Sequence, residues 1–336
     1  MKIAFFGIKD WEIEYIKSKL GGFKSLFFED KYESKYRNQI LDIDILSVFV
    51  SCIIGKKELS ELKNLKFIAT RSTGYDHIDL EACKKANILV SNVPVYGDNT
   101  VAEHTFALIL TLFKKIYTSV DRVKGFNFSI EGLRGFDLKG KTIGVVGTGN
   151  IGKQVVKIAK GFDMNVIAYD IYQSKELVDN FGVKYVDLKY LYSNSDIVTF
   201  HVPYNKHTHH MVNLSNLKDF KKGCYLINTA RGGVCDGTAL LRGCHDGTFA
   251  GIGLDVLEEE VSIREELELL ATTFKEDKKD NYRVMTIENR LLIKRKNVIV
   301  TPHNAFNTEE ALKRILNTTV ENIEAFAENK PINLVN

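Results

Sequence analysis

The chain has 336 residues, which is enough for two domains with ordinary hydrophobic cores. Its 46 basic and 43 acidic side chains leave a formal net charge of +3, which gives no electrostatic reason to expect nucleic acid or a membrane surface as a partner. No apolar stretch approaches the ~20 residues of a membrane-spanning helix. The five cysteines form no CxxC pair and no secretory signal follows Met1, so we expect a reduced, cytoplasmic protein.

Short apolar runs alternate with helix-length segments along most of the chain. Strands alternating with helices favour parallel sheets built from βαβ units, and continuously apolar strands suit sheets covered on both faces. The sequence therefore predicts an α/β protein. The predicted strands cover 2–8, 45–51, 66–72, 88–93, 142–147, 165–170, 195–202, 224–230, 249–256 and 297–302.

A domain boundary is predicted near 97–101, before an apolar helix that starts at Val101. That helix is too apolar on all sides for a surface helix, so we expect it to be buried between domains or subunits. The last amphipathic segment, 308–329, has no strand after it, which indicates that the chain returns to its first domain. We predict a discontinuous substrate domain, residues 1–97 plus 303–336, and a nucleotide-binding domain, residues 98–302.

The stretch GVVGTGNIG has the G-x-G-x-x-G spacing of a dinucleotide-binding loop at Gly147, Gly149 and Gly152. An apolar strand precedes it, a helix follows it, and Asp170 ends the next strand. This arrangement allows a tight turn, a close approach of backbone to pyrophosphate, and phosphate binding at the helix N-terminus. Because a carboxylate at position 170 would repel a 2′-phosphate, we predict NAD as the cofactor rather than NADP.

Three groups at the ends of later strands could carry the chemistry. Arg231 follows the strand at 224–230, Asp255 and the glutamates 258–260 follow the strand at 249–256, and His303 follows the last strand. A lone histidine in this position could equally cap the strand, an arginine before two glycines could be an exposed turn residue, and most of an acidic run is solvated. In one parallel sheet, however, all three would converge at the edge where ligands bind.

Arginine, carboxylate and histidine beside a nicotinamide indicate a specific reaction. The planar fork of arginine matches a substrate carboxylate, and histidine can give a proton to a ketone oxygen as hydride reaches the carbon. A carboxylate bonded to the histidine favours its protonated form. The expected reaction is the reversible reduction of a 2-oxo acid to a 2-hydroxy acid.

With these residues in place, the sequence resembles the D-isomer-specific 2-hydroxyacid dehydrogenases, most closely their D-lactate dehydrogenase branch. The resemblance spans nearly the whole chain, and the absence of a proline after DVLEEE and the long excursion before the last strand fit the D-lactate branch. It implies a Rossmann-type NAD-binding domain and a flavodoxin-like substrate domain with the active site in the cleft between them. The matching blocks are RSTGYDHIDL, VPVYGDNTVAEHTFALIL, VVGTGNIG, HVPYNKHTHHM, INTARGGV, GLDVLEEE and TPHNAF.

The resemblance also implies residue roles. Arg231 would anchor the substrate carboxylate, His303 would be the acid/base, and Glu260 would be the partner of the histidine. Other implied substrate contacts are Thr73, Gly74, Tyr96 and Phe306. The implied cofactor contacts are Gly147, Gly149, Asn150, Ile151, Gly152, Asp170, Val202, Pro203, Thr208, Thr229, Ala230 and Asp255.

Several alternatives stay open. Either Phe49 or Val50, or neither, could close the substrate pocket, so lactate is not separated from a larger 2-hydroxy acid such as 2-hydroxyisocaproate. A glyoxylate or hydroxypyruvate reductase would carry the same three catalytic residues, and an NAD-sensing corepressor is the non-enzyme alternative. The cluster HTHH, residues 207–210, could suggest a metal, but the resemblance places it in a loop beside the cofactor, so no metal is expected. Related enzymes pair through the apolar helix, and a homodimer is therefore expected.

Overall fold

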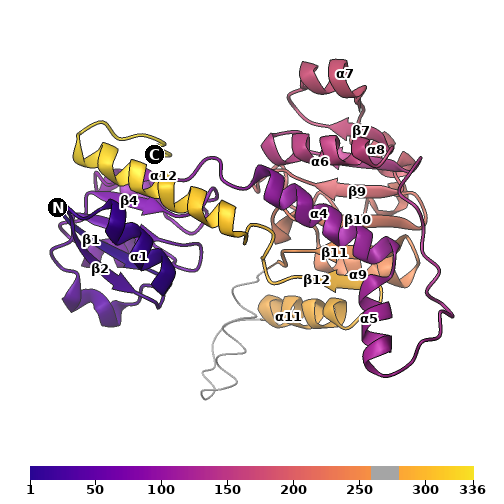
Figure 1. Cartoon of the computed structure of the whole chain (residues 1–336), viewed down its shortest axis with the longest axis horizontal. Coiled ribbons are helices and arrows are strands. Elements are labelled where there is room, and N and C mark those ends of the chain that lie inside the picture. Colours follow the sequence, from indigo (N-terminus) through magenta and orange to yellow (C-terminus); the bar gives the residue numbers. More distant parts are fainter. Residues whose placement is uncertain (259–279) are drawn as a thin grey trace. The chain divides into compact units, whose positions relative to one another are not determined.

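The computed structural model describes residues 1–258 and 280–336, which divide into two compact units. Unit 1 consists of Met1–Tyr96 and Asn307–Asn336, and unit 2 of Gly97–Phe306. Both contain a parallel sheet covered by helices, so the predicted α/β fold class is confirmed (Figure 1). The break falls after Phe306, which places His303 in unit 2, whereas the sequence had suggested a boundary at 302.

Unit 1 is built on a five-stranded parallel sheet of order β2-β1-β3-β4-β5, the flavodoxin-like order. Helix α12 returns late in the chain and packs on β4, where Phe326 stacks on Phe67 at 4.4 Å between ring centroids. Its elements are β1 (Lys2–Phe6), α1 (Asp10–Lys19), β2 (Lys24–Phe28), η1 (Ser34–Gln39), β3 (Ile45–Val48), α2 (Lys56–Glu61), β4 (Phe67–Thr70), α3 (Leu80–Lys85), β5 (Leu89–Ser91) and α12 (Glu309–Ala327).

Unit 2 is built on a seven-stranded parallel sheet of order β12-β11-β10-β9-β6-β7-β8. Counted along the chain this is the Rossmann order 3-2-1-4-5-6 with one strand added. Its elements are α4 (Asp98–Phe113), α5 (Ile116–Lys124), β6 (Thr142–Val146), α6 (Asn150–Gly161), β7 (Asn165–Tyr169), α7 (Lys175–Phe181), β8 (Lys184–Tyr185), α8 (Leu188–Asn194), β9 (Ile197–Phe200), η2 (Leu217–Asp219), β10 (Cys224–Asn228), η3 (Gly232–Val234), α9 (Gly237–His245), β11 (Phe249–Leu254), α11 (Asp280–Ile293) and β12 (Val298–Val300).

Two strands were missed from the sequence, β2 and β8. Both lie at sheet edges, and neither contains a fully buried residue. An edge strand needs fewer apolar side chains than a central one, so the continuous apolar signal that marked the other strands is absent here.

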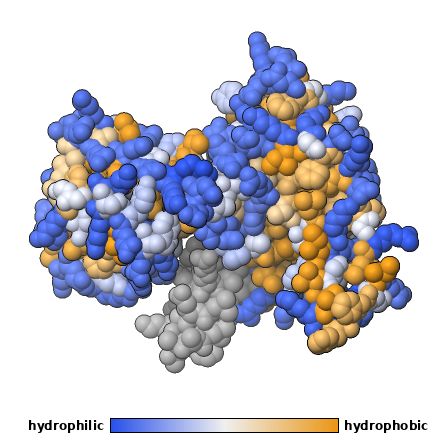
Figure 2. Space-filling view, viewed as in Figure 1, coloured by the Kyte–Doolittle hydropathy of each residue, from blue (hydrophilic) through white to orange (hydrophobic). Residues whose placement is uncertain are grey.

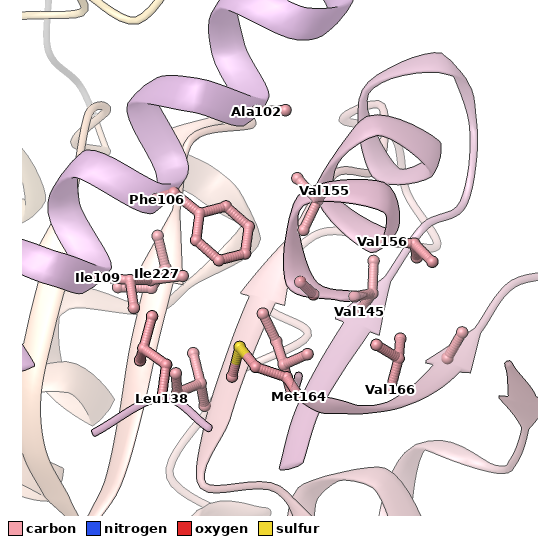
Figure 3. Packing of buried hydrophobic residues seen from close by; sticks show 14 of the residues in the cluster. Ala102, Phe106, Ile109, Leu138, Val145, Val155, Val156, Met164, Val166 and Ile227 are labelled. Atoms are coloured by element: carbon pink, nitrogen blue, oxygen red, sulfur yellow. The ribbon is translucent and has the colours of Figure 1, made fainter. Parts of the chain in front are cut away.

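The apolar helix α4 is buried inside unit 2, against α6 and the strands β10 and β11. Ala102 and Phe106 face Val155 of α6, and Ile109 lies beside Ile227 of β10 (Figure 3). The helix therefore fills the core of its own unit, which explains its composition without a second subunit. Within the described residues, no helix has the length and apolarity needed to cross a membrane.

Candidate active site and cofactor loop

Three neighbouring parallel strands of unit 2 end in one row. Asn228 of β10 is paired with Leu254 of β11, which is paired with Val300 of β12. The segments that carry the three predicted catalytic groups leave the sheet from this row. In an open parallel sheet, ligands bind in the crevice outside the carboxyl ends of the strands, which is where these three strands end.

Asp255 holds the turn that follows β12. Its carboxylate is 1% exposed and accepts hydrogen bonds from the Thr301 hydroxyl and from the amides of Asn304 (2.8 Å) and Ala305 (2.9 Å). The Nε2 atom of His104, on α4, lies 3.4 Å from it. Burial raises the pKa of this carboxyl, but His104, Thr301 and the two amides outweigh burial and leave the pKa below its ordinary value. Asp255 therefore supports the turn, and its predicted contact with the cofactor stays a prediction.

His303 occupies this turn in the left-handed region, with φ +52°. A non-glycine residue in that region costs ~1–3 kcal/mol of conformational free energy, so it persists only where surrounding contacts offset that cost. These contacts come from Asp255, whose carbonyl accepts the His303 amide at 2.9 Å and whose carboxylate binds the next two amides. The half-buried imidazole meets the Phe306 ring edge-on, at 6.3 Å between centroids.

Arg231 is placed by a buried asparagine that the sequence analysis did not single out. Asn228, 1% exposed, donates to the Arg231 carbonyl (2.9 Å) and accepts the Ala230 amide (3.0 Å). The half-buried Arg231 guanidinium donates through Nη1 to the Ala230 carbonyl at 2.8 Å. The signal that could have found Asn228 is a polar residue closing an otherwise apolar strand.

The cofactor loop between β6 and α6 is shaped by missing side chains. Gly147 has φ +92°, and a Cβ there would lie 2.6 Å from the His201 carbonyl oxygen. A Cβ on Gly152 would lie 2.0 Å from the Gly147 carbonyl oxygen, so helix and loop touch. A Cβ on Gly149 would meet nothing within 4 Å, which leaves the loop tip open to a ligand. The exposed Asn150 begins α6, whose first amides precede any intrahelical bond and can bind phosphate.

Asp170 lies beside this loop at the end of β7. Its Oδ2 accepts from the Thr148 amide at 2.6 Å and from the Thr148 hydroxyl at 3.1 Å, and its Oδ1 accepts from the Tyr172 amide at 3.0 Å. A carboxylate has further lone pairs for ribose hydroxyls. The open tip, the helix start and this carboxylate together fit NAD, which supplies or accepts a hydride when bound.

The remaining predicted cofactor residues divide into two groups. The Thr208 hydroxyl donates to the Pro203 carbonyl at 2.6 Å, and the Thr229 hydroxyl lies 3.0 Å from that of Thr105 on α4, so both side chains brace the protein. Val202, Pro203, Ile151 and Ala230 offer mainly backbone and apolar surface, and each lies in or beside a loop at the carboxyl edge of the sheet or at the start of α6.

His201 is a further group at this edge that the sequence analysis left without a role. Its Nε2 lies 2.9 Å from the Thr199 hydroxyl, and its Nδ1 is enclosed with no hydrogen-bond partner among the described residues. Burial lowers the pKa of His201 to about 3, so its ring is neutral at physiological pH. A neutral imidazole behind Gly147 adds no charge to the cofactor loop.

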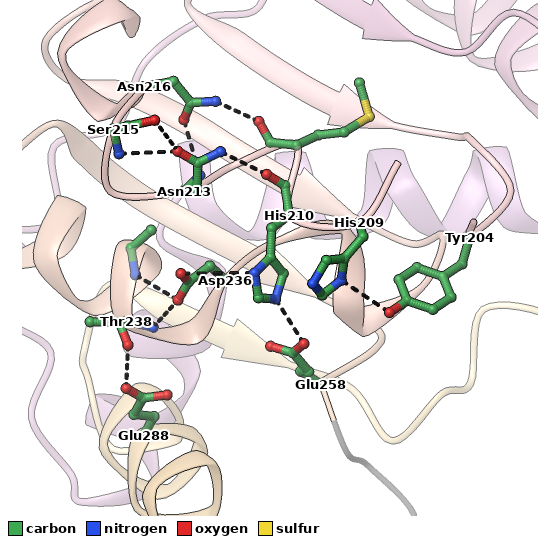
Figure 4. Close-up of polar contacts among 12 residues, drawn as sticks. Tyr204, His209, His210, Asn213, Ser215, Asn216, Asp236, Thr238, Glu258 and Glu288 are labelled. Carbon is green, nitrogen blue, oxygen red and sulfur yellow. Dashed lines mark hydrogen bonds and ion pairs between the residues drawn. The ribbon is translucent and has the colours of Figure 1, made fainter. Parts of the chain in front are cut away.

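The imidazoles of His209 and His210 in the HTHH cluster make hydrogen bonds (Figure 4). His210 Nε2 lies 2.8 Å from a Glu258 carboxylate oxygen, and His209 Nδ1 lies 3.0 Å from the Tyr204 hydroxyl. The two imidazoles stack at 3.8 Å between ring centroids. His209, His210 and Glu258 each offer a ligand atom, and these atoms lie within 4.8 Å of one another, so the three residues could hold a metal ion and the expectation of no metal stays a prediction. Glu260, the predicted partner of His303, lies outside the described residues.

In unit 1, the predicted substrate residues follow β4 and β5. Thr73 is exposed and Gly74 half-buried, and neither backbone amide donates to an acceptor within residues 1–258 or 280–336. The carbonyl of Tyr96 accepts a hydrogen bond from the Arg314 guanidinium on α12. Two adjacent amides at an exposed loop are the donors that an anionic group requires.

Comparison with known proteins agrees with this geometry. The family model described as "D-isomer specific 2-hydroxyacid dehydrogenase, NAD binding domain" matches residues 106–305. The D-lactate dehydrogenase of Escherichia coli is 34% identical over 327 residues, 96% of each chain. An aromatic 2-oxoacid reductase of Clostridium sporogenes is 32% identical, covering 97% of this chain and 96% of the relative.

Among solved structures, the D-lactate dehydrogenase of Aquifex aeolicus complexed with NAD and lactic acid superimposes with a TM-score of 0.87 and 37% identity, covering 98% of this chain and 96% of that one. The strand orders of both units, the cofactor loop and these full-length relatives all lead to one family. The chain belongs to the D-isomer-specific 2-hydroxyacid dehydrogenases, which are oxidoreductases, and NAD is its cofactor.

Proposed function

We propose that this chain is a D-lactate dehydrogenase, which interconverts pyruvate and D-lactate with NADH and NAD. The observation that carries the proposal is the row of strand ends in unit 2, where Asn228 sets the Arg231 loop and Asp255 sets the His303 turn. An anion-binding fork and an imidazole on rigid supports are the groups that 2-oxo acid reduction requires. The similarity to two D-lactate dehydrogenases over almost the full chain supports pyruvate as the substrate.

In the proposed mechanism the chain binds, orients and exchanges one proton. In this scheme the Arg231 guanidinium binds the substrate carboxylate, and the amides of Thr73 and Gly74 are further donors to it. The protonated imidazole of His303 donates to the ketone oxygen in reduction and accepts that proton back in oxidation. Glu260 stabilises the protonated imidazole in this scheme. Tyr96 and Phe306 contribute apolar walls.

Phe49 is the residue we propose to set substrate size. It directly follows β3, whose last residue Val48 is paired with Thr70 of β4, so Phe49 lies at the same edge of the unit 1 sheet as the Thr73–Gly74 loop. A large ring beside a carboxylate-binding loop leaves room for a methyl group better than for an aromatic one. An apolar pocket of this kind separates two substrates that differ by one methylene by ~1–3 kcal/mol in transition-state binding.

The test is a panel of kcat/KM values for pyruvate, 2-oxoisocaproate, phenylpyruvate, glyoxylate and hydroxypyruvate with NADH. Pyruvate should rank first, and Phe49→Ala should move the preference toward phenylpyruvate. A wild-type preference for phenylpyruvate would instead make the chain an aromatic 2-oxoacid reductase, as its relative from C. sporogenes is named. Preference for glyoxylate or hydroxypyruvate would also overturn the lactate assignment.

We also propose a homodimer that pairs through α5 and the segment after it. Large apolar side chains there are exposed, including Tyr117 (67%), Phe126 (90%), Phe128 (74%) and Ile130 (84%). Figure 2 shows a hydrophobic, orange area at the lower right, on the side where Figure 1 places α5. A second copy of the chain is the partner we expect, because a contiguous apolar surface of this kind marks an interface.

Light scattering after size exclusion should give twice the 38.1 kDa mass of the chain. The double variant Phe126→Ser with Ile130→Ser should shift the mass toward the monomer. Ile53→Ser is the matched control, because Ile53 is 59% exposed and belongs to unit 1. A monomeric wild type would remove the dimer from the proposal.

A further inference from the structure

The Thr73–Gly74 loop of unit 1 rests on a relay of side-chain amides. The Thr73 carbonyl accepts a hydrogen bond from Asn92 Nδ2, and the Asn92 carbonyl accepts one from Asn322 Nδ2, both at 2.8 Å. Asn333 Nδ2 donates to Asn322 Oδ1 at 2.8 Å, and the Asn333 carbonyl accepts the Asn92 amide at 3.1 Å. The relay joins the loop after β4, the end of β5, helix α12 and the segment that follows α12.

The amides of this relay are buried and specific. Asn322 is fully buried and Asn92 is 7% exposed. An apolar side chain of similar volume would fill the same space without the cost of burying polar atoms, so packing alone does not explain either asparagine. The side-chain amides of Asn92 and Asn322 fix the orientation of the main-chain carbonyls that they bond, those of Thr73 and Asn92.

The direction matters because of peptide geometry. The Thr73 carbonyl and the Gly74 amide belong to one planar trans peptide unit, in which C=O and N–H point in opposite directions. When Asn92 holds the Thr73 carbonyl on the buried side, the Gly74 N–H is turned to the other side. Neighbouring bonds hold the rest of the loop, since the Thr73 hydroxyl donates to the Val93 carbonyl (2.7 Å) and the Ser72 hydroxyl to the Gly74 carbonyl (2.6 Å).

We propose that Asn92 and Asn322 are positioning residues for the substrate: they orient the Thr73–Gly74 peptide so that the Gly74 amide binds the substrate carboxylate. This inference rests on the proposed function, which assigns that amide this role. It makes helix α12 and the segment around Asn333 part of substrate recognition, although none of these side chains touches the substrate. Because only carboxylate binding depends on the relay, its loss should raise the KM for the 2-oxo acid more than it lowers kcat.

The test compares Asn92→Ala and Asn322→Ala with Asn317→Ala. Asn317 is a matched control, because it is an asparagine on the same helix whose exposed side chain bonds Tyr15 and leads away from the loop. We expect the KM for pyruvate to rise about tenfold in the two relay variants, with kcat within about twofold and an unchanged Kd for NADH. Asn317→Ala should match the wild type.

Binding of oxamate to the NADH complex provides a readout without turnover, and its affinity should fall by the same factor as KM rises. If Asn322→Ala does not fold, Asn92→Ala and Asn333→Gly decide the question in the same way, because Asn333 has φ +53°, which glycine tolerates. Unchanged KM and oxamate affinity in folded relay variants of an active enzyme overturn this inference alone. An equal loss of kcat and NADH affinity also overturns it, because it would show general structural damage. A wild type inactive on every 2-oxo acid overturns the proposed function instead.

Discussion

The cofactor loop after β6 and the His303 turn after β12 leave the same sheet at the same edge, but they are stabilised in opposite ways. The loop takes its shape from absent side chains, because Gly147 and Gly152 allow backbone to lie against backbone. The turn takes its shape from a buried carboxylate, Asp255, which binds two amides and a hydroxyl around a left-handed histidine. The loop is shaped by its own glycines, and the turn is shaped by the hydrogen bonds of a carboxylate from another part of the chain.

The difference follows from what each segment has to do. A loop that binds pyrophosphate needs open amides and close approach, and glycine provides both. A turn that presents an acid/base group needs one fixed orientation of one side chain, which only surrounding bonds can impose. The contacts that hold the turn therefore come from three places: Asp255 after β11, Thr301 after β12, and His104 on α4.

The largest effect is expected when the imidazole of His303 is removed and the turn is kept. His303→Asn retains a residue that tolerates the left-handed region but has no acid/base group. We expect kcat for pyruvate to fall by ~10²–10⁴, the usual contribution of general acid/base catalysis, with NADH affinity unchanged. Stopped-flow turnover and NADH fluorescence titration measure the two. Turnover within tenfold of the wild type would exclude His303 from proton transfer.

The proposed binding of the substrate carboxylate by Arg231 is tested by Arg231→Lys. Lysine keeps the charge but lacks the planar fork, so kcat/KM for pyruvate should fall by roughly 10–100-fold. NADH affinity should not change, because the cofactor loop after β6 is intact. Near-normal kinetics would mean that another group binds the carboxylate.

The role of the Asp255 carboxylate in holding the His303 turn is tested by Asp255→Asn. An amide cannot accept from every donor around it, so the free energy of unfolding at pH 7 should fall by about 1–3 kcal/mol. The depressed pKa of Asp255 stabilises the wild type fully above 3.8, and this contribution is lost as the pH falls through the lower folded-state value. Urea unfolding between pH 2.5 and 7 should therefore show a shallower acid loss in Asp255→Asn. Equal slopes for both proteins would contradict this role.

The roles of the glycines in the cofactor loop are tested by a pair of variants. Gly152→Ala places a Cβ 2.0 Å from the Gly147 carbonyl oxygen and should cost ~1–3 kcal/mol of stability. Gly149→Ala meets no protein atom within 4 Å, so its melting temperature should stay unchanged while NADH affinity falls about tenfold through loss of close backbone approach. If the two variants lost stability equally, the loop tip would not be open.

The same contrast explains what could be predicted from the sequence. The glycine loop, Asp170 and the central strands were predictable because neighbouring residues specify them. Edge strands β2 and β8 lacked the apolar signal, and the roles of His104 and Asn322 depend on partners far along the chain. The partners of Asn228 are only two and three residues away, but the sequence does not show that its side chain turns toward them. A single sequence shows that such residues are polar within apolar segments, but not what they hold.

The family resemblance supplied another part of the account, namely which of three glutamates to assign. Glu258, the first of the run, bonds His210 and is accounted for by that contact. The role of Glu260 stays a prediction, as do the roles of Arg231 and His303. The structure adds the hydrogen bonds by which Asn228 holds the Arg231 loop and Asp255 holds the His303 turn.

Hydride transfer from NADH to a 2-oxo acid with fixed handedness can be followed with NADH deuterated at C4 of the nicotinamide. Pyruvate would be reduced with cofactor deuterated on either face in turn, and the lactate resolved by chiral chromatography and mass spectrometry. The account predicts D-lactate, with deuterium at C2 from one face of the cofactor only. L-lactate, or D-lactate without deuterium from either face, would contradict it.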